Sequence, residues 1–281
     1  MGIVWERAAE RPGEIMNDKP AMAERDAAEF VSYYAKQSLT PAAQERSRRI
    51  YEVVTRTIGR PGEALDVADI GCGPGAQSMV WALAGHRVSG LDVNEGLLEL
   101  ARQRSAQAGL EIEFQKGTAE ALPFADASVD VCLAPELLEH VPNWAACLRE
   151  FARILRPGGV MYLSTTNRLC PVQMEYELPL YSWYPARLKR RYERLAVTTR
   201  RELVNYATYP AVHWFTFYQL RDFLKAQGIA SLDRFDMIDS EQLGTLPRLA
   251  LGTVRAVPPL RWAGHVMTPY TNMLGIKQKA N

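Results

Sequence analysis

The feature that most constrains the fold is an alternation of short apolar runs with helical patterns through the middle of the chain. The helical patterns lie at 76–84, 95–108 and 143–155. The β-rich runs around them are Leu65–Ile70, Val88–Leu91, Ile112–Gln115, Val129–Leu133 and Val160–Ser164. Strands that alternate with helices form β-α-β units, and therefore a parallel sheet with helices on both faces. Because such crossovers are right-handed, we expect a doubly wound α/β sheet.

The remaining segments flank this alternation. We expect further helices at 21–36, 41–58 and 216–227, and further strands at 231–238 and 270–276. Residues 168–212 interrupt the pattern with four prolines and six tyrosines, and we interpret them as an insertion after the fifth strand. We divide the chain into an N-terminal arm with helices at 1–58, expected to cover the substrate, and one domain at 59–281.

Composition limits the partners and the compartment. The 281 residues carry 33 basic and 32 acidic side chains, so no overall field attracts nucleic acid, and none is expected as a partner. Four cysteines without a C-x-x-C pair are typical of reduced thiols in a cytoplasmic protein. The N-terminus lacks the pattern of a signal peptide, and no apolar run is long enough to span a membrane. We therefore expect a cytoplasmic protein, at most peripheral to the inner membrane face.

A glycine-rich loop follows the first strand. The run VADIGCGPG ends that strand at Asp69 and then places glycines at every second position, at Gly71, Gly73 and Gly75. Glycines allow a tight turn and let backbone N–H groups approach a ligand closely. At the end of the next strand lies Asp92, where an acid can accept both hydroxyls of a ribose. An adenosine compound is the expected ligand. The glycine spacing alone does not distinguish a methyl donor from NAD.

These motifs, with GTAEALPF (117–124) and LRPGGVMYLSTTNR (155–168), resemble the class I, seven-stranded, Rossmann-like S-adenosylmethionine-dependent methyltransferases. The resemblance covers about residues 60–168 well and 213–278 loosely. It implies a mostly parallel seven-stranded sheet, with 59–281 as the methyltransferase domain and S-adenosyl-L-methionine as the cofactor. The motifs are most similar to those of the ubiquinone-pathway O-methyltransferases.

The resemblance also implies roles for individual residues. Asp69 and the glycine loop would hold the methionine end of the donor, Asp92 the ribose, and 118–120 the adenine rim. Many relatives carry Asp where this chain has Thr118, so that contact is weaker here. The implied donor-binding residues are Asp69, Gly71, Cys72, Gly73, Gly75, Asp92, Val93, Thr118, Ala119, Glu120 and Pro135.

The segment after the fourth strand carries three groups capable of chemistry. It reads CLAPELLEHVPN, and on one helical turn Glu136, Glu139 and His140 would share a face. With His213 as a fourth candidate, they could bind a divalent metal such as Mg²⁺. The segment resembles the ubiquinone-pathway O-methyltransferases and the small-RNA 2′-O-methyltransferases, which use Glu-x-x-Glu-His with a metal. Two alternatives stay open: His140 with Glu136 as metal-free general base or hydroxyl orienter, and a purely structural role.

Two later segments bear on the substrate. Residues 187–201 hold seven basic side chains and one acid, which fits a solvated helix face, contact with an anionic membrane surface, or a phosphate site. Residues 243–266 are apolar with interspersed arginines, as in a surface-lying segment or a lid. Together they favour a hydrophobic or lipid-linked small molecule. Asp126 and Asp130 are expected in the turn before the fourth strand, without a chemical role.

The function that these features favour is O-methylation of a hydroxyl on an apolar or lipid-linked small molecule. Methyl transfer from an activated donor needs alignment and exclusion of water rather than a covalent enzyme intermediate. That requirement agrees with the lack of a convincing Ser-His-Asp or Cys-His arrangement. The alternatives are N- or C-methylation of a small metabolite, an NAD(P)-dependent oxidoreductase, and a non-catalytic relative that binds a partner.

Overall fold

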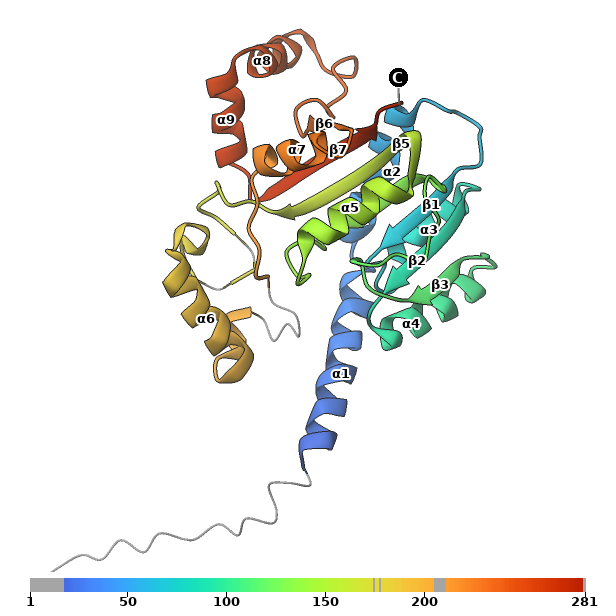
Figure 1. Ribbon diagram of the computed structural model, residues 1–281, viewed down its shortest axis with the longest axis vertical. Coiled ribbons are helices and arrows are strands. Elements are labelled where there is room, and N and C mark those ends of the chain that lie inside the picture. Colours follow the sequence, from blue (N-terminus) through green and yellow to red (C-terminus); the bar gives the residue numbers. More distant parts are fainter. Residues whose placement is uncertain (1–17, 174, 177, 205–210, 280–281) are drawn as a thin grey trace, which may run out of the picture.

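The strands form one doubly wound sheet, as the alternation predicts. The computed structural model describes residues 18–173, 175–176, 178–204 and 211–279. Among them, seven strands lie in the order β3-β2-β1-β4-β5-β7-β6, and β7 runs antiparallel to both of its neighbours (Figure 1). Their bounds are β1 Asp66–Ile70, β2 Arg87–Asp92, β3 Glu113–Lys116, β4 Val129–Pro135, β5 Leu155–Thr166, β6 Ile229–Asp233 and β7 Tyr270–Lys277.

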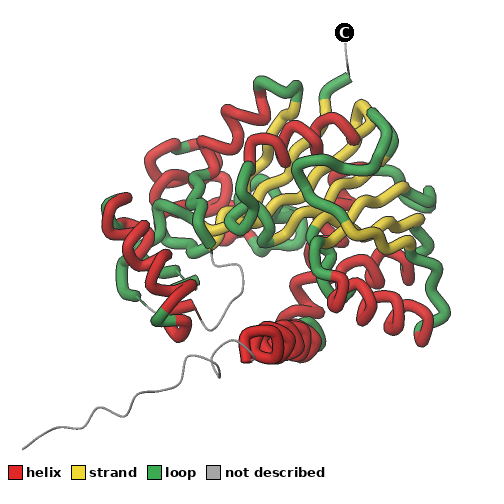
Figure 2. Tube along the Cα trace, turned by 60° about the horizontal axis from the view of Figure 1, so that its bottom comes forward, coloured by secondary structure: helices red, strands yellow, loops and turns green. Residues whose placement is uncertain are grey.

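Helices cover both faces of this sheet (Figure 2). Their bounds are α1 Asp18–Gln37, α2 Pro41–Ile58, α3 Ala76–Leu83, α4 Glu95–Gln107, α5 Trp144–Ile154, α6 Ala186–Thr198, α7 Phe217–Lys225, α8 Thr245–Ala256 and α9 Pro258–Val266. Short 3-10 helices lie at Tyr181–Trp183 and Arg201–Val204. The α/β class and the mostly parallel sheet are thereby confirmed.

The buried strand residues divide between two cores because successive side chains point to opposite faces. In β1 and β4, Ala68 and Cys132 belong to the core that α5 and α7 cover. Their neighbours Val67 and Val131 belong to the core that α2 and α3 cover. Both faces of the central strands are therefore apolar, which explains why they read as continuous apolar runs.

The N-terminal helices follow their predicted bounds closely. The Thr40 hydroxyl accepts a hydrogen bond from the Ala43 amide at 3.3 Å, which caps α2. Gly59, with φ of 64°, ends the same helix. The Arg104 guanidinium of α4 donates to the Ala35 carbonyl at 2.9 Å and so holds the end of α1. Residues 1–17 of the predicted N-terminal arm lie outside the described residues.

The C-terminal part differs from the prediction in two respects. Strand β6 ends at Asp233 rather than continuing to 238, because the Asp233 carboxylate accepts the Phe235 and Asp236 amides and turns the chain. The apolar segment at 243–266 forms the two helices α8 and α9 at the top of Figure 1.

The structure also bears on two expectations drawn from composition. All four cysteines are buried and unpaired, which agrees with free thiols. No helix in the described ranges is long and apolar enough to cross a bilayer. The expected cytoplasmic location stays a prediction.

Asp130 does not lie in the turn before β4, where the sequence placed it. It is the second residue of that strand and only 4% exposed. Its carboxylate accepts the Arg60 and Arg156 guanidiniums at 2.5 and 2.8 Å, and the Asp66 amide at 2.9 Å. Burial acts to raise the pKa of this carboxyl, but these donors outweigh it and hold the pKa below its ordinary value. Asp130 therefore ties β1, β4 and β5 together.

We expect Asp130→Ala to lower the free energy of unfolding by about 2 kcal/mol, because two guanidiniums and one amide lose their acceptor. Asp126→Ala is the matched control, since the Asp126 side chain is 80% exposed and its ion pair among the described residues is with Arg153. That change should stay within about 0.5 kcal/mol. Urea unfolding measures both values. Equal effects of the two substitutions would contradict the bracing role of Asp130.

Candidate functional site

The predicted donor-binding residues lie at the carboxyl ends of adjacent parallel strands. Cys72 follows β1, Val93 follows β2, 118–120 follow β3, and Pro135 ends β4. Strand β1 lies between β2 and β4. The connection after β1 runs toward one edge of the sheet and the connection after β4 toward the other, so the strand order reverses between β1 and β4. Such a switch point is where open α/β sheets bind their ligands.

The glycine loop is joined to the end of β2 by backbone hydrogen bonds. The Gly71 and Cys72 amides donate to the Leu91 carbonyl at 2.7 and 3.1 Å. Gly73 has φ of +51°, and a Cβ built there would meet nothing within 4 Å. Gly75 has φ of +79°, and a Cβ there would lie 3.0 Å from that of Ala101. The turn requires left-handed backbone, and the space above Gly73 is open to a ligand.

Asp92 is the carboxylate that joins the loop to the next strand. Its Oδ2 accepts the Gly73 amide at 2.9 Å, and its Oδ1 accepts the Asn94 amide at 2.8 Å. Burial raises the pKa of this carboxyl. Each oxygen of a carboxylate accepts more than one hydrogen bond, so capacity for ligand hydroxyls remains.

Asp69 lies beneath the loop and is 1% exposed. The Ser78 hydroxyl donates to its Oδ2 at 2.6 Å. Its Oδ1 is buried and has no hydrogen-bond partner among the described residues. Burial raises the pKa of this carboxyl to about 6. A buried acceptor that lacks a partner needs a donor from a ligand or water.

The adenine-rim residues differ in exposure. Thr118 is exposed, whereas Ala119 is buried. The Glu120 carboxylate accepts the Asn143 amide at a long 3.4 Å, which connects this loop to the start of α5. Ala119 and Glu120 can thus present backbone groups to a ligand, as the departure at Thr118 suggested.

Glu136 lies on the other side of the switch point, just after β4. Its φ of +52° is uncommon for a residue other than glycine, and such backbone strain clusters at functional sites. Its amide donates to the Ser164 carbonyl at 2.8 Å. Its Oε1 accepts the Arg46 guanidinium of α2 at 2.5 Å. The N-terminal helices therefore contribute a charged partner to the site.

Several groups that sequence reasoning missed lie near Glu136. Burial, and then the charge of Glu136, raises the pKa of Glu175 to about 7. Burial raises the pKa of Tyr34 and of Tyr162 to about 12, and that of Tyr270 further; Glu136 acts on all three. The charge of Glu136 thus acts on three tyrosines and one carboxyl from α1, β5, β7 and the insertion. None of these tyrosines belongs to the tyrosine-rich insertion, and no sequence pattern pointed to them.

Glu139 points into the protein and is fully buried. Its Oε2 accepts the Thr165 hydroxyl at 2.7 Å, and burial raises the pKa of its carboxyl to about 8. The His213 amide donates to the Glu139 carbonyl at 3.2 Å, so His213 lies beside it. Glu139 Oε1 and His213 Nε2 are buried without a hydrogen-bond partner in the described ranges.

The structure does not bring Glu136, Glu139, His140 and His213 together as one ligand set. Glu136 pairs with Arg46, while Glu139 is turned toward Thr165. The described residues hold no group of three or more His, Cys, Asp or Glu side chains placed to bind a metal ion. The reason is the left-handed backbone at Glu136, which ends the regular helical spacing assumed for this segment.

Comparison with known proteins gives matches that include the glycine loop. Residues 68–163 match a protein-family model described as a methyltransferase domain. The chain is 42% identical over 124 residues to the ubiquinone biosynthesis O-methyltransferase of Ruegeria pomeroyi, covering 43% of this chain and 50% of that one. It is 43% identical over 103 residues to the enzyme of that name from Stutzerimonas stutzeri, covering 36% and 44%. The chain thus spans about half the length of these relatives.

A solved structure supports the same fold. The S-adenosylmethionine-dependent methyltransferase of Mesorhizobium loti matches with a TM-score of 0.53 at 18% identity, covering 81% of this chain and 97% of that one. The fold is that of the Rossmann-like methyltransferases. The match of residues 68–163 to a methyltransferase-domain model agrees with the resemblance drawn from the motifs.

The raised pKa of Glu139 predicts how stability depends on pH. Its ordinary value of 4.5 rises to about 8 in the fold, so the stability it contributes is present at low pH and is lost as pH rises through 8. Glu139→Gln keeps the shape without the ionisation. Urea unfolding measures the free energy of unfolding of both proteins at pH 5 and pH 8. Between these two pH values we expect that of the variant to rise by about 1 kcal/mol or more relative to that of the unmodified protein. A parallel pH dependence of the two proteins would contradict the buried, uncharged Glu139.

Proposed function

We propose that this chain is an S-adenosylmethionine-dependent methyltransferase that O-methylates a hydroxyl on an apolar or lipid-linked small molecule. The observation that carries the proposal is the open loop at Gly73 between two buried carboxyls, Asp92 and Asp69. The curated relatives, named ubiquinone biosynthesis O-methyltransferases, support the choice of oxygen as acceptor.

The residues present fit the donor. Asp92 retains acceptor capacity for two ribose hydroxyls, and the Asp69 Oδ1 without a partner fits a cationic amino group. The other proposed binding residues are Gly71, Cys72, Gly73, Gly75, Val93, Thr118, Ala119, Glu120 and Pro135. When bound, the donor supplies a methyl group already activated by a sulfonium. The chain then has to align the acceptor and exclude water.

We propose that the acceptor hydroxyl lies near Glu136 and loses its proton to a neighbouring base. His140 and Glu136 remain the candidates predicted from the sequence, with the Glu136 carboxylate held in place by Arg46. Glu175 joins them, because a carboxyl with a pKa of about 7 can accept a proton at neutral pH. Tyr34, Tyr162 and Tyr270 would form the wall of the acceptor site.

Metal binding has less support. As placed, Glu136, Glu139, His140 and His213 do not fit one ion, and we derive no step through a metal.

The lid role of the N-terminal helices has more support. The charges of Glu136 and Asp92 both raise the pKa of Tyr34 in α1. Helix α1 can therefore shield the site from water.

The donor site gives the first test. We expect Asp92→Ala to weaken binding of S-adenosylmethionine by at least about thirtyfold in isothermal titration, because each hydrogen bond to a charged group contributes roughly 1.5–3 kcal/mol. Asp92→Asn, which keeps one acceptor, should weaken binding less. Glu95→Ala at the exposed start of α4 is the control and should bind as the unmodified protein does. Binding of nicotinamide nucleotides instead would favour the oxidoreductase alternative and overturn the proposal.

The base gives a second test. Cell extract is incubated with the protein and a donor bearing a deuterated methyl group, and mass spectrometry follows transfer and identifies the methylated atom. We expect the rate to rise as pH passes about 7, since Glu175 must lose its proton first, and Glu175→Gln to be slower by about a hundredfold without that rise. Glu113→Gln on the exposed β3 is the control. A rise that persists in Glu175→Gln and vanishes in His140→Gln would assign the proton to the imidazole.

We further propose a peripheral membrane contact through residues 187–201. Arg190, Arg191 and Arg194 of α6 are exposed, and each basic residue near an anionic surface contributes on the order of 1 kcal/mol. The protein should sediment with phosphatidylglycerol vesicles at low salt and be released as salt rises. Glutamine at all three positions should abolish sedimentation. Sedimentation that survives both changes would contradict the contact.

A further inference from the structure

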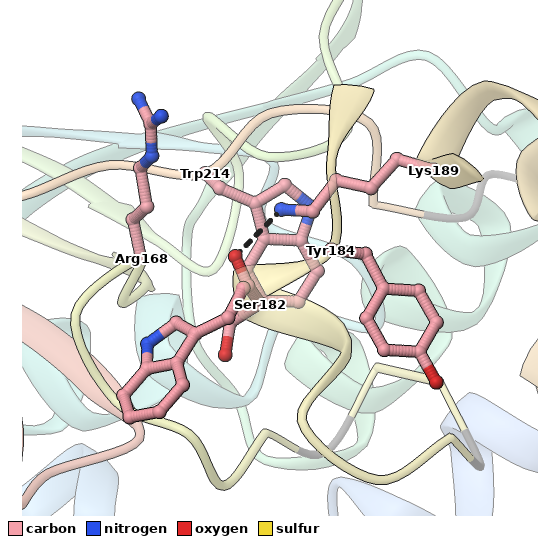
Figure 3. Close-up of a pocket in the computed structure, with 6 residues that line it drawn as sticks. Arg168, Ser182, Tyr184, Lys189 and Trp214 are labelled. Carbon is pink, nitrogen blue, oxygen red and sulfur yellow. Dashed lines mark hydrogen bonds between the residues drawn. The ribbon is translucent and has the colours of Figure 1, made fainter. Parts of the chain in front are cut away.

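A hollow of about 430 Å³ opens beside α6 (Figure 3), and neither the glycine loop nor Glu136 is part of its lining. Its walls come from the loop after β5, the segment at η1 Tyr181–Trp183, α6, and the strand-like run before α7. The lining residues are Arg168, Ser182, Trp183, Tyr184, Lys189 and Trp214. Two are cationic, three are aromatic and none is acidic.

Lys189 faces this hollow rather than solvent, unlike the neighbouring arginines of α6. Its Nζ donates to the Ser182 carbonyl at 2.9 Å and lies 4.7 Å from the centroid of the Trp214 ring. An ammonium has three N–H groups, so two remain beyond this hydrogen bond. Burial, and then the nearby charge of Arg168, lowers the pKa of Lys189 to about 8. Two like charges placed together are stabilised by an anion between them.

Trp214 supplies a further donor. The residue is 9% exposed, and its Nε1 is buried without a hydrogen-bond partner in the part of the chain that the structure describes. Figure 3 shows the indole beside the Lys189 side chain. Buried indole N–H groups ordinarily have an acceptor. Trp214, Lys189 and the exposed Arg168 thus line one hollow, and the Ser182 carbonyl is the acceptor of the Lys189 ammonium.

Glu193 is the acid of α6 whose charge acts on Lys189, but it does not line the hollow. Burial raises the pKa of the Glu193 carboxyl, while the charges of Lys189 and Arg190 act to lower it. The lining itself holds two cations and no acid, while the rings of Trp183, Tyr184 and Trp214 provide flat apolar walls. This combination matches a carboxylate or phosphate carried on a flat apolar body.

We propose that the hollow binds a carboxylate or phosphate group of the acceptor molecule, through Arg168, Lys189 and the Trp214 indole. Arg168 lies two residues after β5, and Trp214 follows His213, whose amide donates to the Glu139 carbonyl. The anion site is thus on the acceptor side of the protein. Assignment to the acceptor rests on the proposed methyl transfer, whereas anion binding itself does not.

The test uses three small probes of similar shape, measured by isothermal titration with the full chain. Benzoate and phenyl phosphate carry the two anions, and benzamide is the neutral control. We expect an anionic probe to bind and benzamide not to bind. Binding of benzoate alone assigns a carboxylate, and binding of phenyl phosphate alone assigns a phosphate. No anionic probe binding, or benzamide binding equally well, would overturn the proposal.

Variants assign the binding to this hollow. Arg168→Gln and Lys189→Gln should each weaken anion binding about tenfold or more, because each removes a charge-assisted hydrogen bond. Trp214→Phe keeps the ring and removes the N–H, and should also weaken it. Arg191→Gln, an exposed cation of α6 outside the hollow, is the matched control and should not. Unchanged affinity in the first three variants would contradict the site.

Binding of S-adenosylmethionine separates this proposal from the proposed function. All four variants should bind the donor as the unmodified protein does, which also shows that they fold. If the donor fails to bind while an anion binds through Arg168 and Lys189, the methyltransferase proposal fails and the anion site stands. If the donor binds and no anion does, the anion site fails and the methyltransferase proposal stands.

Discussion

The structure of the candidate site depends on the hydrogen bond between the Gly73 amide and the Asp92 carboxylate. This contact joins the loop after β1 to the end of β2 at 2.9 Å. With the Gly71 and Cys72 amides on the Leu91 carbonyl, it holds the turn in a left-handed conformation that side chains disfavour. One carboxylate therefore shapes the loop and keeps acceptor capacity for a ligand. This explains why the glycines and the acid occur together.

A second constraint is the burial of acids on the acceptor side. Glu139 is fully buried, and burial also raises the pKa of Glu175. Burying a carboxyl without a cation is unfavourable, so such groups are kept neutral at neutral pH or kept for chemistry. Glu136 instead stays beside Arg46. Carboxyls in different environments can thus take different roles: Glu175 can accept a proton, while Glu136 can position a ligand.

The sheet and the donor loop could be predicted because each is determined by residues that are close together in the sequence. Apolar runs between helical patterns indicated the β-α-β order, and the glycine loop followed by Asp92 indicated an adenosine-binding turn. The acceptor side could not be predicted, since Tyr34, Glu175 and Tyr270 come from distant segments that meet only in the fold. The metal hypothesis assumed a regular helix after β4, and the left-handed Glu136 shows why that spacing does not hold. Asp130 was misplaced because its partners Arg60 and Arg156 are remote in sequence.

The central claim is that Asp92 and the glycine loop together form an adenosyl site. A crystal structure of the protein with S-adenosylhomocysteine tests it most directly. We expect both ribose hydroxyls within hydrogen-bond distance of the Asp92 carboxylate, with the amino group on the Asp69 side of the loop. A ligand bound elsewhere, or a loop closed over by side chains so that no ligand enters, would contradict it.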